Sequence, residues 1–267
     1  MSHPRGRPKD GSLPPGGKAR SAKGAPMTLL CLDCGNTRLK WGLRDGETWR
    51  DQGAVPIEDI ASLTQVLAAM PRPAGAIACN VAGPAARGAL AALAETLGVD
   101  LAWSSSAAQQ CGVKNGYQDP GQLGVDRWAA LIGARSLRVS ACLVVIAGTA
   151  TTIDLLDADG VFRGGLILPG IALMRSSLAA NTAQLPGGGG SYSELPRNTA
   201  DAIASGCLQA TAGAIERMFA RIAAEHDALC MISGGAAAEL LPLLDLPLAQ
   251  IDNLVLEGLA RMAREDH

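Results

Sequence analysis

The sequence predicts an α/β protein built from two similar halves. Two apolar segments, 29–40 and 142–154, share one organisation: a strand, a turn of glycine with hydroxyl residues, and a second strand. Each continues to an Asp-Gly turn, and the spacing between the two glycines is nearly equal, 46 − 35 = 11 and 160 − 148 = 12. Helices and strands alternate after both hairpins, which is typical of α/β architecture. We therefore expect a duplicated unit with its functional site in the cleft between the halves.

Predicted helices and strands alternate along the first half after its hairpin. Pro71-Arg72-Pro73 stops the first helix, and residues 104–122 are polar and are expected to form a loop. The expected elements are a helix over 57–70, a buried strand over 76–81, a helix over 83–98, a short strand over 99–103 and a helix over 124–137.

The second half follows the same plan. Three strands are expected between residues 141 and 168, and Pro169-Gly170 then opens a helix. Four consecutive glycines, residues 187–190, form a loop before a long helix. The later elements expected are a helix through 180, a helix over 198–225, a strand over 229–232 and helices over 236–241 and 253–264.

The composition indicates a packed globular protein. The 267 residues carry a net charge of −2 and are 48% hydrophobic but only 3% aromatic. This charge argues against nucleic acid or an anionic membrane as the main partner, and few aromatic rings are available to stack on bases. No apolar run approaches the ~18–20 residues that span a bilayer. We find no secretory signal and expect a cytoplasmic protein.

The chain is expected to begin with a tail that does not fold. Residues 1–26 are rich in Pro, Gly, Ser, Lys and Arg, a composition that buries too little apolar surface for folding. We expect a disordered basic tail, with the fold starting at Met27. The rest is expected to form an N-terminal domain of residues 27–138 and a C-terminal domain of residues 139–267.

Seven cysteines, an odd number scattered along the chain, do not suggest a disulfide framework. Cys31 and Cys34 are spaced as C-x-x-C, but strand residues three apart point to opposite faces. Buried thiols acting as small hydrophobic side chains are the favoured interpretation, and zinc or redox chemistry is the alternative.

The first turn carries groups suited to a phosphate chain. Asp33 ends the first strand, Gly35-Asn36-Thr37 form the turn, and Arg38 and Lys40 follow. Turn N–H groups can hold phosphate oxygens, and a carboxylate can orient Mg²⁺. Lys40 can neutralise charge that builds on a transferred group. An ordinary hairpin with a capping aspartate is the alternative.

The second turn, Gly148-Thr149-Ala150-Thr151-Thr152, offers backbone N–H groups and three hydroxyls. Thr149 and Thr151 are the residues that could contact phosphate. A threonine-rich strand favoured by β-propensity is the alternative.

A third motif, Gly124-Val125-Asp126-Arg127, opens a predicted helix. Asp126 is either a base that accepts a hydroxyl proton or a residue that stabilises the helix N-terminus. Arg127 could hold a carboxylate or phosphate through two hydrogen bonds. Tyr117 lies in the polar loop and is either a ligand contact or an incidental residue. Thr199 stands at the start of the long helix and is either a ligand contact or the residue that caps that helix.

The chain lacks G-x-x-x-x-G-K-[ST], G-x-G-x-x-G and the protein-kinase motifs, so an ATP site must be built another way. Its own motifs, taken in order from Met27 onward, resemble those of the type III pantothenate kinases. The matching motifs are Asp33-x-Gly-Asn-Thr37, Asn115-Gly-Tyr117, Gly124-x-Asp-Arg127, Gly148-Thr-Ala-x-Thr152-x-Asp154, Gly164-Gly-x-Ile-x-Pro-Gly170 and Asn198-Thr199.

This resemblance implies a fold and a reaction. The family belongs to the superfamily of acetate and sugar kinases, heat-shock chaperones and actin. It therefore implies two ribonuclease-H-like domains of the actin-like ATPase fold, with the active-site cleft between them, and a homodimer. The implied reaction is transfer of a phosphoryl group from ATP, bound with Mg²⁺, to pantothenate, giving 4′-phosphopantothenate in the first step of coenzyme A biosynthesis.

The resemblance also implies the site residues. Asp126 matches the proton acceptor. The implied ATP-binding residues are Asp33, Cys34, Gly35, Asn36, Thr37, Arg38, Leu39, Lys40 and Thr149. The implied substrate-binding residues are Tyr117, Gly124, Val125, Asp126, Arg127 and Thr199.

One position departs from the family pattern. The family usually has an aspartate three residues before the threonine matched by Thr149, and it binds a monovalent cation; this chain has Ile146. An apolar side chain cannot ligate a cation, so we expect no strong K⁺ site centred there. Backbone oxygens, or a preference for NH₄⁺ over K⁺, remain as alternatives.

Two other functions stay open from the sequence. One is a nucleotide-binding accessory or regulatory protein of the same fold without pantothenate kinase activity. The other is a different small-molecule kinase of the superfamily.

Overall fold

The computed structural model describes residues 28–181 and 189–265 of the chain. The tail expected over residues 1–26 lies outside the described residues, as do positions 187 and 188 of the four-glycine loop. Within the two described ranges, no helix combines the length and the apolar character needed to cross a membrane.

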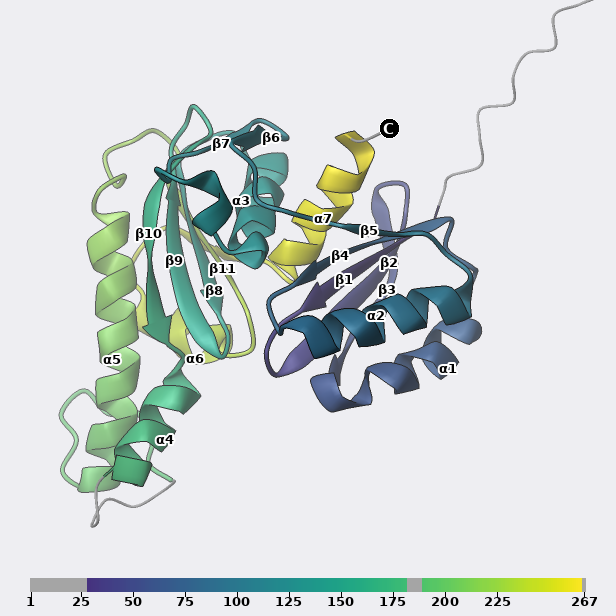
Figure 1. Ribbon diagram of the computed structural model, residues 1–267. Helices are drawn as coiled ribbons and strands as arrows, with labels where there is room; N and C mark the ends of the chain where they lie inside the picture. The colour runs from purple at the N-terminus through teal and green to yellow at the C-terminus, as the bar shows by residue number, and fades with distance from the viewer. Residues whose placement is uncertain (1–27, 182–188, 266–267) are drawn as a thin grey trace, which may run out of the picture.

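The first half forms a five-stranded sheet with the order β3-β2-β1-β4-β5 (Figure 1). β1, β2 and β3 are antiparallel neighbours, whereas β4 and β5 run parallel to β1. Its strands are β1 (Thr28–Cys34), β2 (Arg38–Asp45), β3 (Thr48–Pro56), β4 (Gly75–Asn80) and β5 (Leu101–Trp103). The five C-terminal residues of β1 are buried, as expected of a central strand covered on both faces.

Short helices cover one face of this sheet (Figure 1). They are η1 (Ile57–Ser62), α1 (Leu63–Ala68) and α2 (Pro84–Leu97). Leu30 and Leu32 of β1 pack with Leu63 and Leu90 in the core under these helices. The helix expected over 57–70 is thus a 3-10 helix that becomes α-helical at Leu63.

The second sheet repeats the plan of the first. Its seven strands have the order β12-β11-β8-β9-β10-β7-β6. From β10 to β12, the order and the directions match those of β3 to β5, with two antiparallel pairs followed by two parallel pairs. The strands are β6 (Gln109–Gln110), β7 (Val113–Asn115), β8 (Cys142–Ala147), β9 (Ala150–Leu156), β10 (Val161–Pro169), β11 (Leu229–Ser233) and β12 (Leu248–Gln250). The predicted duplication is confirmed by this common strand order.

Part of the segment expected to be a loop joins the second sheet. β7 pairs in parallel with β10, and β6 pairs with β7. The same segment contains η2 (Pro120–Gln122). β6 and β7 are short and contain no apolar run, unlike the equally short β5, so only their pairing reveals them. Strands from both sides of residue 138 therefore share a sheet, and the domain division at that position stays a prediction.

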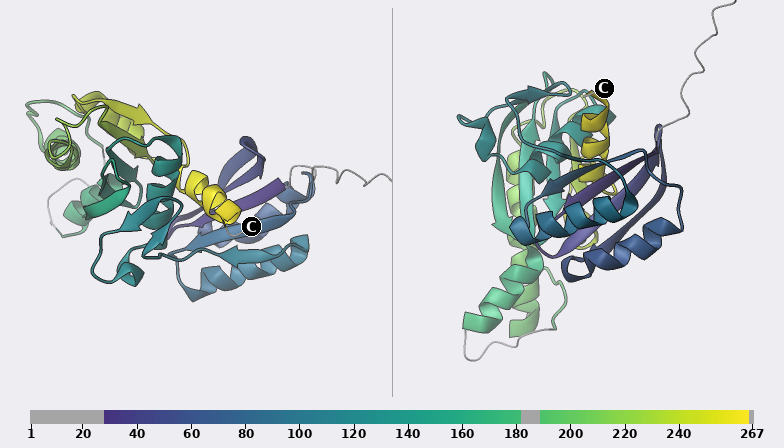
Figure 2. Two further views of the ribbon diagram at one scale, coloured as in Figure 1. Left: turned by 90° about the horizontal axis from the view of Figure 1, so that it is seen from above. Right: turned by 45° about the vertical axis from the view of Figure 1, so that its right-hand side comes forward.

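Two helices cover the outer face of the second sheet and extend past its end (Figures 1 and 2). They are α4 (Ile171–Asn181) and α5 (Thr199–Phe219). The helix expected over 198–225 ends at Phe219 because tight turns with i→i+3 hydrogen bonds replace the α-helical pattern up to Glu225. α6 (Ala237–Leu240) and η3 (Leu241–Leu243) follow β11 at the same end of the sheet from which α4 starts.

Helices α3 (Val125–Leu137) and α7 (Leu254–Glu265) lie side by side between the two sheets (Figures 1 and 2). Their crossing is very close: a Cβ added to Gly258 would lie 1.8 Å from the carbonyl oxygen of Ala129. A Cβ on Gly133 would lie 2.3 Å from the carbonyl oxygen of Leu254. The core around these helices includes residues of both sheets, so α3 and α7 join the two halves.

Candidate active site

The two predicted turns lie against each other, although 112 residues separate them in the chain. The hydroxyl oxygens of Thr37 and Thr149 are 2.9 Å apart, within hydrogen-bonding distance, and both residues are exposed. Each turn is closed by its glycine: Gly35 N–H donates to the Arg38 carbonyl at 3.1 Å, and Gly148 N–H donates to the Ala150 carbonyl at 3.0 Å. The fold therefore presents two hydroxyl-bearing bends as one surface.

Neighbouring glycines support the second bend from behind. Gly170 N–H donates to the carbonyl of Thr149 at 2.9 Å, and a Cβ on Gly170 would lie 2.2 Å from the carbonyl oxygen of Gly148. Gly234 has φ +106°, and its Cβ would lie 2.3 Å from the carbonyl oxygen of Ala147. Only glycine fits so close to a backbone, so these two positions hold the bend in place.

Asp33 lies at the end of β1, next to the first bend, and is 9% exposed. It is paired in register with Lys40 on β2 and with Cys79 on β4, whose thiol donates to Asp33 Oδ1 at 3.3 Å. Burial raises the pKa of Asp33 and so does the charge of Asp126, whereas Lys40 and the thiol act in the opposite direction. Burial also raises the pKa of Cys79 well above its ordinary value, so the thiol stays protonated and donates.

Asp126 lies in the first turn of α3 and is half-buried. Its Oδ1 accepts a hydrogen bond from the backbone N–H of Arg127 at 2.8 Å. A Cβ on Gly124 would approach that same oxygen to 2.7 Å. The negative charge of Asp126 contributes to the raised pKa of both Asp33 and Asp154.

Arg127 is held by a buried ion pair. Its Nε donates to Asp154 Oδ2 at 3.0 Å, and its Nη2 donates to Asp154 Oδ1 at 2.5 Å. Its Nη1 donates to the hydroxyl of Tyr117 at 3.0 Å. The pKa of Asp154 is raised because burial outweighs the hydrogen bonds and the charge of Arg127. Tyr117, Asp126 and Arg127, predicted from two separate motifs, therefore lie together.

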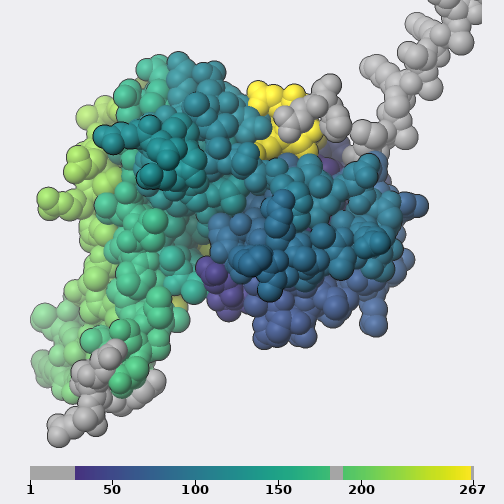
Figure 3. All heavy atoms as spheres, in the orientation of Figure 1, coloured from purple at the N-terminus to yellow at the C-terminus, as the bar shows by residue number. Residues whose placement is uncertain are grey.

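Thr199 lies apart from this group. It is the first residue of α5 and lines a groove between α4 and α5, together with Leu173, Met174 and Leu178. Asn198, not Thr199, caps the helix by accepting a hydrogen bond from Asp201 N–H at 2.9 Å. Figure 3 shows α4 projecting below the body of the molecule, with a hollow between it and the N-terminal residues drawn in purple.

Ile146 faces two hydroxyl residues on the neighbouring strands. It is paired with Thr152 on β9 and with Ser233 on β11. The Thr152 hydroxyl is buried and has no hydrogen-bond partner among the described residues. In the same described part of the chain, no three His, Cys, Asp or Glu residues are grouped as metal ligands. The predicted burial of all seven cysteines is confirmed.

Cys79 and Asp154, which contact Asp33 and Arg127, had no predicted role. Cys79 is buried in an apolar strand, and only the β1–β4 register sets it beside Asp33. Asp154 stands in the second motif, but its partner Arg127 is 27 residues away. A buried aspartate in a strand is the one sequence signal that could have pointed to such a partner.

The strand order shared by both sheets, with paired bends between them, defines the fold of actin-like ATPases and sugar kinases. The structure of a Campylobacter jejuni protein assigned to the Baf family of transcriptional activators aligns with a TM-score of 0.58 at 20% identity, covering 89% of this chain and 98% of that one. The structure of a Sinorhizobium meliloti protein assigned as a 2-dehydro-3-deoxygalactonokinase aligns with a TM-score of 0.54 at 14% identity, covering 89% and 99%. At such identities these similarities show the fold alone.

Sequence similarity is more specific. A family model described as type III pantothenate kinase matches residues 29–221. The type III pantothenate kinase of Aromatoleum aromaticum is 54% identical over 238 residues, covering 89% of this chain and 98% of the relative. That of Azoarcus sp. is 50% identical over 240 residues, covering 89% and 91%. The chain belongs to the type III pantothenate kinase family.

Proposed function

We propose that this chain transfers the γ-phosphoryl group of ATP to the primary hydroxyl of pantothenate, the reaction that yields 4′-phosphopantothenate for coenzyme A biosynthesis. Membership of the family supports the reaction. The observation that carries the site is the contact between Thr37 and Thr149, because it gathers the two bends beside Asp33.

The ATP end of the site consists of the two bends. The residues proposed to hold the phosphates are Asp33, Cys34, Gly35, Asn36, Thr37, Arg38, Leu39, Lys40 and Thr149. Bend N–H groups and threonine hydroxyls are suitable donors for phosphate oxygens. A divalent metal bound with ATP supplies charge neutralisation, and the Asp33 carboxylate at the rim of the bends is an oxygen donor of the type such ions prefer. Lys40, which is paired with Asp33 on the neighbouring strand β2, adds a positive charge.

The acceptor end consists of the start of α3 and the loop before it. Asp126 is proposed to accept the proton of the pantothenate hydroxyl. The other residues proposed to bind pantothenate are Tyr117, Gly124, Val125, Arg127 and Thr199. An alcohol is a weak acid, and phosphoryl transfer depends mainly on positioning and charge. Asp126 therefore takes the proton as the new P–O bond forms.

A coupled assay of ADP release, with and without pantothenate, tests the function. We expect release to require pantothenate and the product to carry one phosphate. ADP release that is independent of pantothenate would contradict the proposal and leave an ATPase or a nucleotide-binding accessory protein.

The same assay in Na⁺, K⁺ and NH₄⁺ tests the cation. We propose that no strong K⁺ site is centred on Ile146, since an apolar side chain cannot ligate a cation. The expected result is similar turnover in Na⁺ and K⁺. A large activation by K⁺ would contradict this proposal.

We further propose that the chain forms a homodimer through α4, α5 and the end of β10. Leu166, Ile167, Leu173 and Leu178 are large apolar residues that are 41–65% exposed on these elements. An exposed apolar patch of this kind is typical of an interaction surface. Thr199 lies in the same groove and away from Tyr117, so the partner subunit's Thr199 would reach the acceptor across the interface. The cytoplasmic location stays a prediction.

A further inference from the structure

We infer that Asp154 is a positioning residue for the acceptor side of the site: it fixes the guanidinium of Arg127 and, through it, Tyr117 and the start of α3. This inference rests on the proposed function. It concerns a residue to which neither the motifs nor the relatives assign a role.

The geometry of the ion pair fixes the guanidinium in one plane. Asp154 accepts hydrogen bonds from Nε and Nη2 at 3.0 and 2.5 Å, so both carboxylate oxygens are used. The side chains of Arg127 and Asp154 are 5% and 1% exposed. A bidentate pair sets both distance and orientation, which a single hydrogen bond does not.

Arg127 links both parts of the proposed acceptor site, Tyr117 through its guanidinium and Asp126 through its backbone. Its Nη1 donates to the Tyr117 hydroxyl at 3.0 Å, and it lies 5.7 Å from the Tyr117 ring centre. The Tyr117 ring packs on Phe162 of β10 at 5.3 Å between ring centres. Arg127 also follows Asp126 directly and donates its backbone N–H to that carboxylate. One buried carboxylate of β9 thus anchors Arg127 of α3 and, through it, the loop residue Tyr117, which packs on β10.

The surrounding backbone leaves space for this arrangement and no more. A Cβ on Gly165 would lie 1.9 Å from Asp154 Oδ1 and 2.9 Å from Arg127 Nη2. A Cβ on Gly116, next to Tyr117, would lie 1.9 Å from the Phe162 carbonyl oxygen. Two glycines are therefore required for the ion pair and the tyrosine to occupy their positions.

Stability alone does not explain such a pair. Desolvation of two charges offsets most of their attraction, and apolar side chains of similar volume often serve as well in a core. This pair also directs a hydrogen-bond donor of Arg127 toward Tyr117, which is proposed to bind pantothenate. It therefore positions a binding residue, which a purely structural ion pair does not do.

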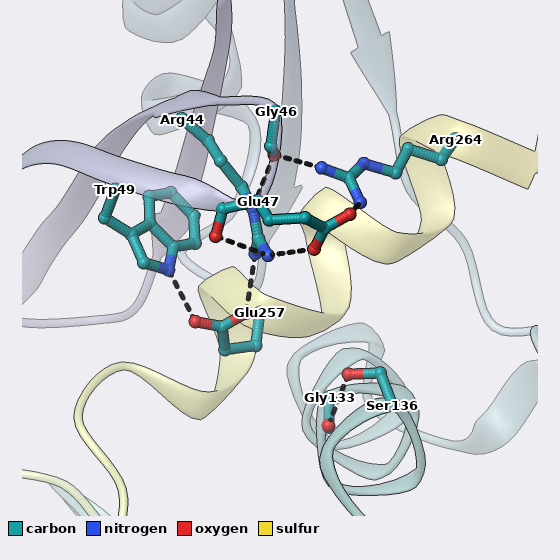
Figure 4. Close-up of polar contacts among 8 residues, drawn as sticks. All are labelled: Arg44, Gly46, Glu47, Trp49, Gly133, Ser136, Glu257 and Arg264. Atoms are coloured by element: carbon teal, nitrogen blue, oxygen red, sulfur yellow. Dashed lines mark hydrogen bonds and ion pairs between the residues drawn. The ribbon is translucent and has the colours of Figure 1, made fainter.

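The molecule contains a matched control at a distance from the bends. Arg44 Nη1 donates to Glu257 Oε2 at 2.6 Å, with side-chain exposures of 11% and 16%, and Trp49 Nε1 donates to the other oxygen at 2.5 Å (Figure 4). This pair also joins a strand to a helix, but Arg44 lies at the opposite end of β2 from Lys40. Glu257→Gln therefore makes the same chemical change as Asp154→Asn, away from the site.

Steady-state kinetics and thermal unfolding of the full chain test the inference. For Asp154→Asn we expect kcat/KM for pantothenate to fall at least ~10-fold while KM for ATP changes less than about twofold, as for a lost positioning contact. For Glu257→Gln we expect a comparable loss of Tm with both kinetic constants unchanged. Equal kinetic effects of the two variants, or parallel changes toward both substrates in Asp154→Asn, would overturn the inference.

Two further variants keep the test decisive. In the Asp154→Asn background, Tyr117→Phe should cost much less kcat/KM for pantothenate than it costs in the wild type, since the hydroxyl has lost its fixed partner. If Asp154→Asn does not fold, Asp154→Glu keeps the charge but displaces the carboxylate from its bidentate position, and the same pantothenate-specific loss is expected. Full additivity, or a normal Asp154→Glu enzyme, would count against Asp154.

The wild type separates this inference from the function on which it rests. A wild-type chain that does not phosphorylate pantothenate defeats the proposed function itself. An active wild type, with Asp154→Asn indistinguishable from Glu257→Gln, defeats only the role given to Asp154.

Discussion

Asp33 is an acid placed where its charge is unfavourable. Burial raises its pKa, and the nearby charge of Asp126 acts in the same direction. A carboxyl whose pKa is raised by folding holds its proton more tightly in the folded chain than in the unfolded one. Its contribution is therefore neutral below the ordinary aspartate range and becomes destabilising as pH rises through and above that range. The Asp33 carboxylate beside the two bends therefore destabilises the fold when it is ionised. Such an unfavourable group is typical of a functional site.

Replacing Asp33 should therefore stabilise the free protein. Asp33→Asn keeps the shape and an acceptor for the Cys79 thiol but removes the charge. We expect a stability gain on the order of 1 kcal/mol at pH 8, a rise in Tm of roughly 2–4 °C, that disappears toward pH 4. Calorimetric scans of both proteins between pH 4 and 8 measure this difference, and other buried acids cancel because both chains contain them. A gain that is the same at every pH would show that the charge is not its cause.

The removal of the proposed base should separate binding from turnover. Asp126→Asn keeps the half-buried shape in the first turn of α3, so we expect normal ATP binding and a loss of at least ~10²-fold in kcat. Asp159→Asn, which removes an exposed carboxylate in the Asp159-Gly160 turn, is the control and should leave kcat unchanged. Isothermal titration with ATP and the coupled ADP assay give the two measurements. Near-normal turnover of Asp126→Asn would remove it from this role.

At the scale of elements, the crossing of α3 and α7 determines how the halves meet. Gly133 and Gly258 bring the two helix backbones into contact, and buried residues of both sheets surround them. Glycine is a poor helix former, costing about 1 kcal/mol relative to alanine in a helix interior. Glycine is nevertheless required at position 258 of α7, because any side chain there would collide with the carbonyl of Ala129.

Two glycine substitutions should thus have opposite effects. Gly258→Ala places a methyl group 1.8 Å from a backbone oxygen, and we expect a loss of about 1–3 kcal/mol from forced separation of the helices. Gly213→Ala is the matched control, because Gly213 lies in α5, is exposed and has nothing within 4 Å of its added Cβ. It should gain roughly 0.5–1 kcal/mol. Urea unfolding of both variants and the wild type measures these changes in the free energy of unfolding. A Gly258→Ala variant more stable than the wild type would contradict the tight crossing.

At the scale of the whole molecule, α4 and the adjoining end of α5 project beyond the body of the fold (Figures 1 and 3), and together with β10 they form an apolar face. It carries exposed Ile167 and Leu173 together with Thr199 in the groove. A second copy of the chain covering this face would bury the apolar residues. It would also bring Thr199, a predicted substrate-binding residue, to the acceptor site of the other subunit.

A charge on this face should therefore separate the subunits and impair activity together. We expect Ile167→Asp or Leu173→Asp to halve the mass measured by light scattering and to raise KM for pantothenate at least ~10-fold, as for loss of a positioning contact. Val139→Asp is the control, since Val139 is 73% exposed but lies on the connection between α3 and β8. A wild-type chain that is monomeric at assay concentration would contradict the proposed dimer.

Much of the fold follows from local pattern. The apolar runs of β1 and β8 and the Ala- and Leu-rich period of α2 indicate the elements directly. The motifs also predict the two bends and the start of α3, because it is their order along the chain, and not any single motif, that resembles one family. β6, β7 and β12 are not predicted because, unlike the equally short β5, they lie in polar or mixed segments without a clear apolar run. Their pairing partners are distant in the chain.

The sequence by itself determined the alternation of helices and strands, the duplicated hairpins and the family, because each is written in neighbouring residues. Only the tertiary structure decided that Thr37 meets Thr149, that Cys79 holds Asp33 and that Asp154 holds Arg127. These contacts join residues between 27 and 112 positions apart. They exist only after two sheets and the α3–α7 crossing have set their distances, and no local pattern contains that geometry.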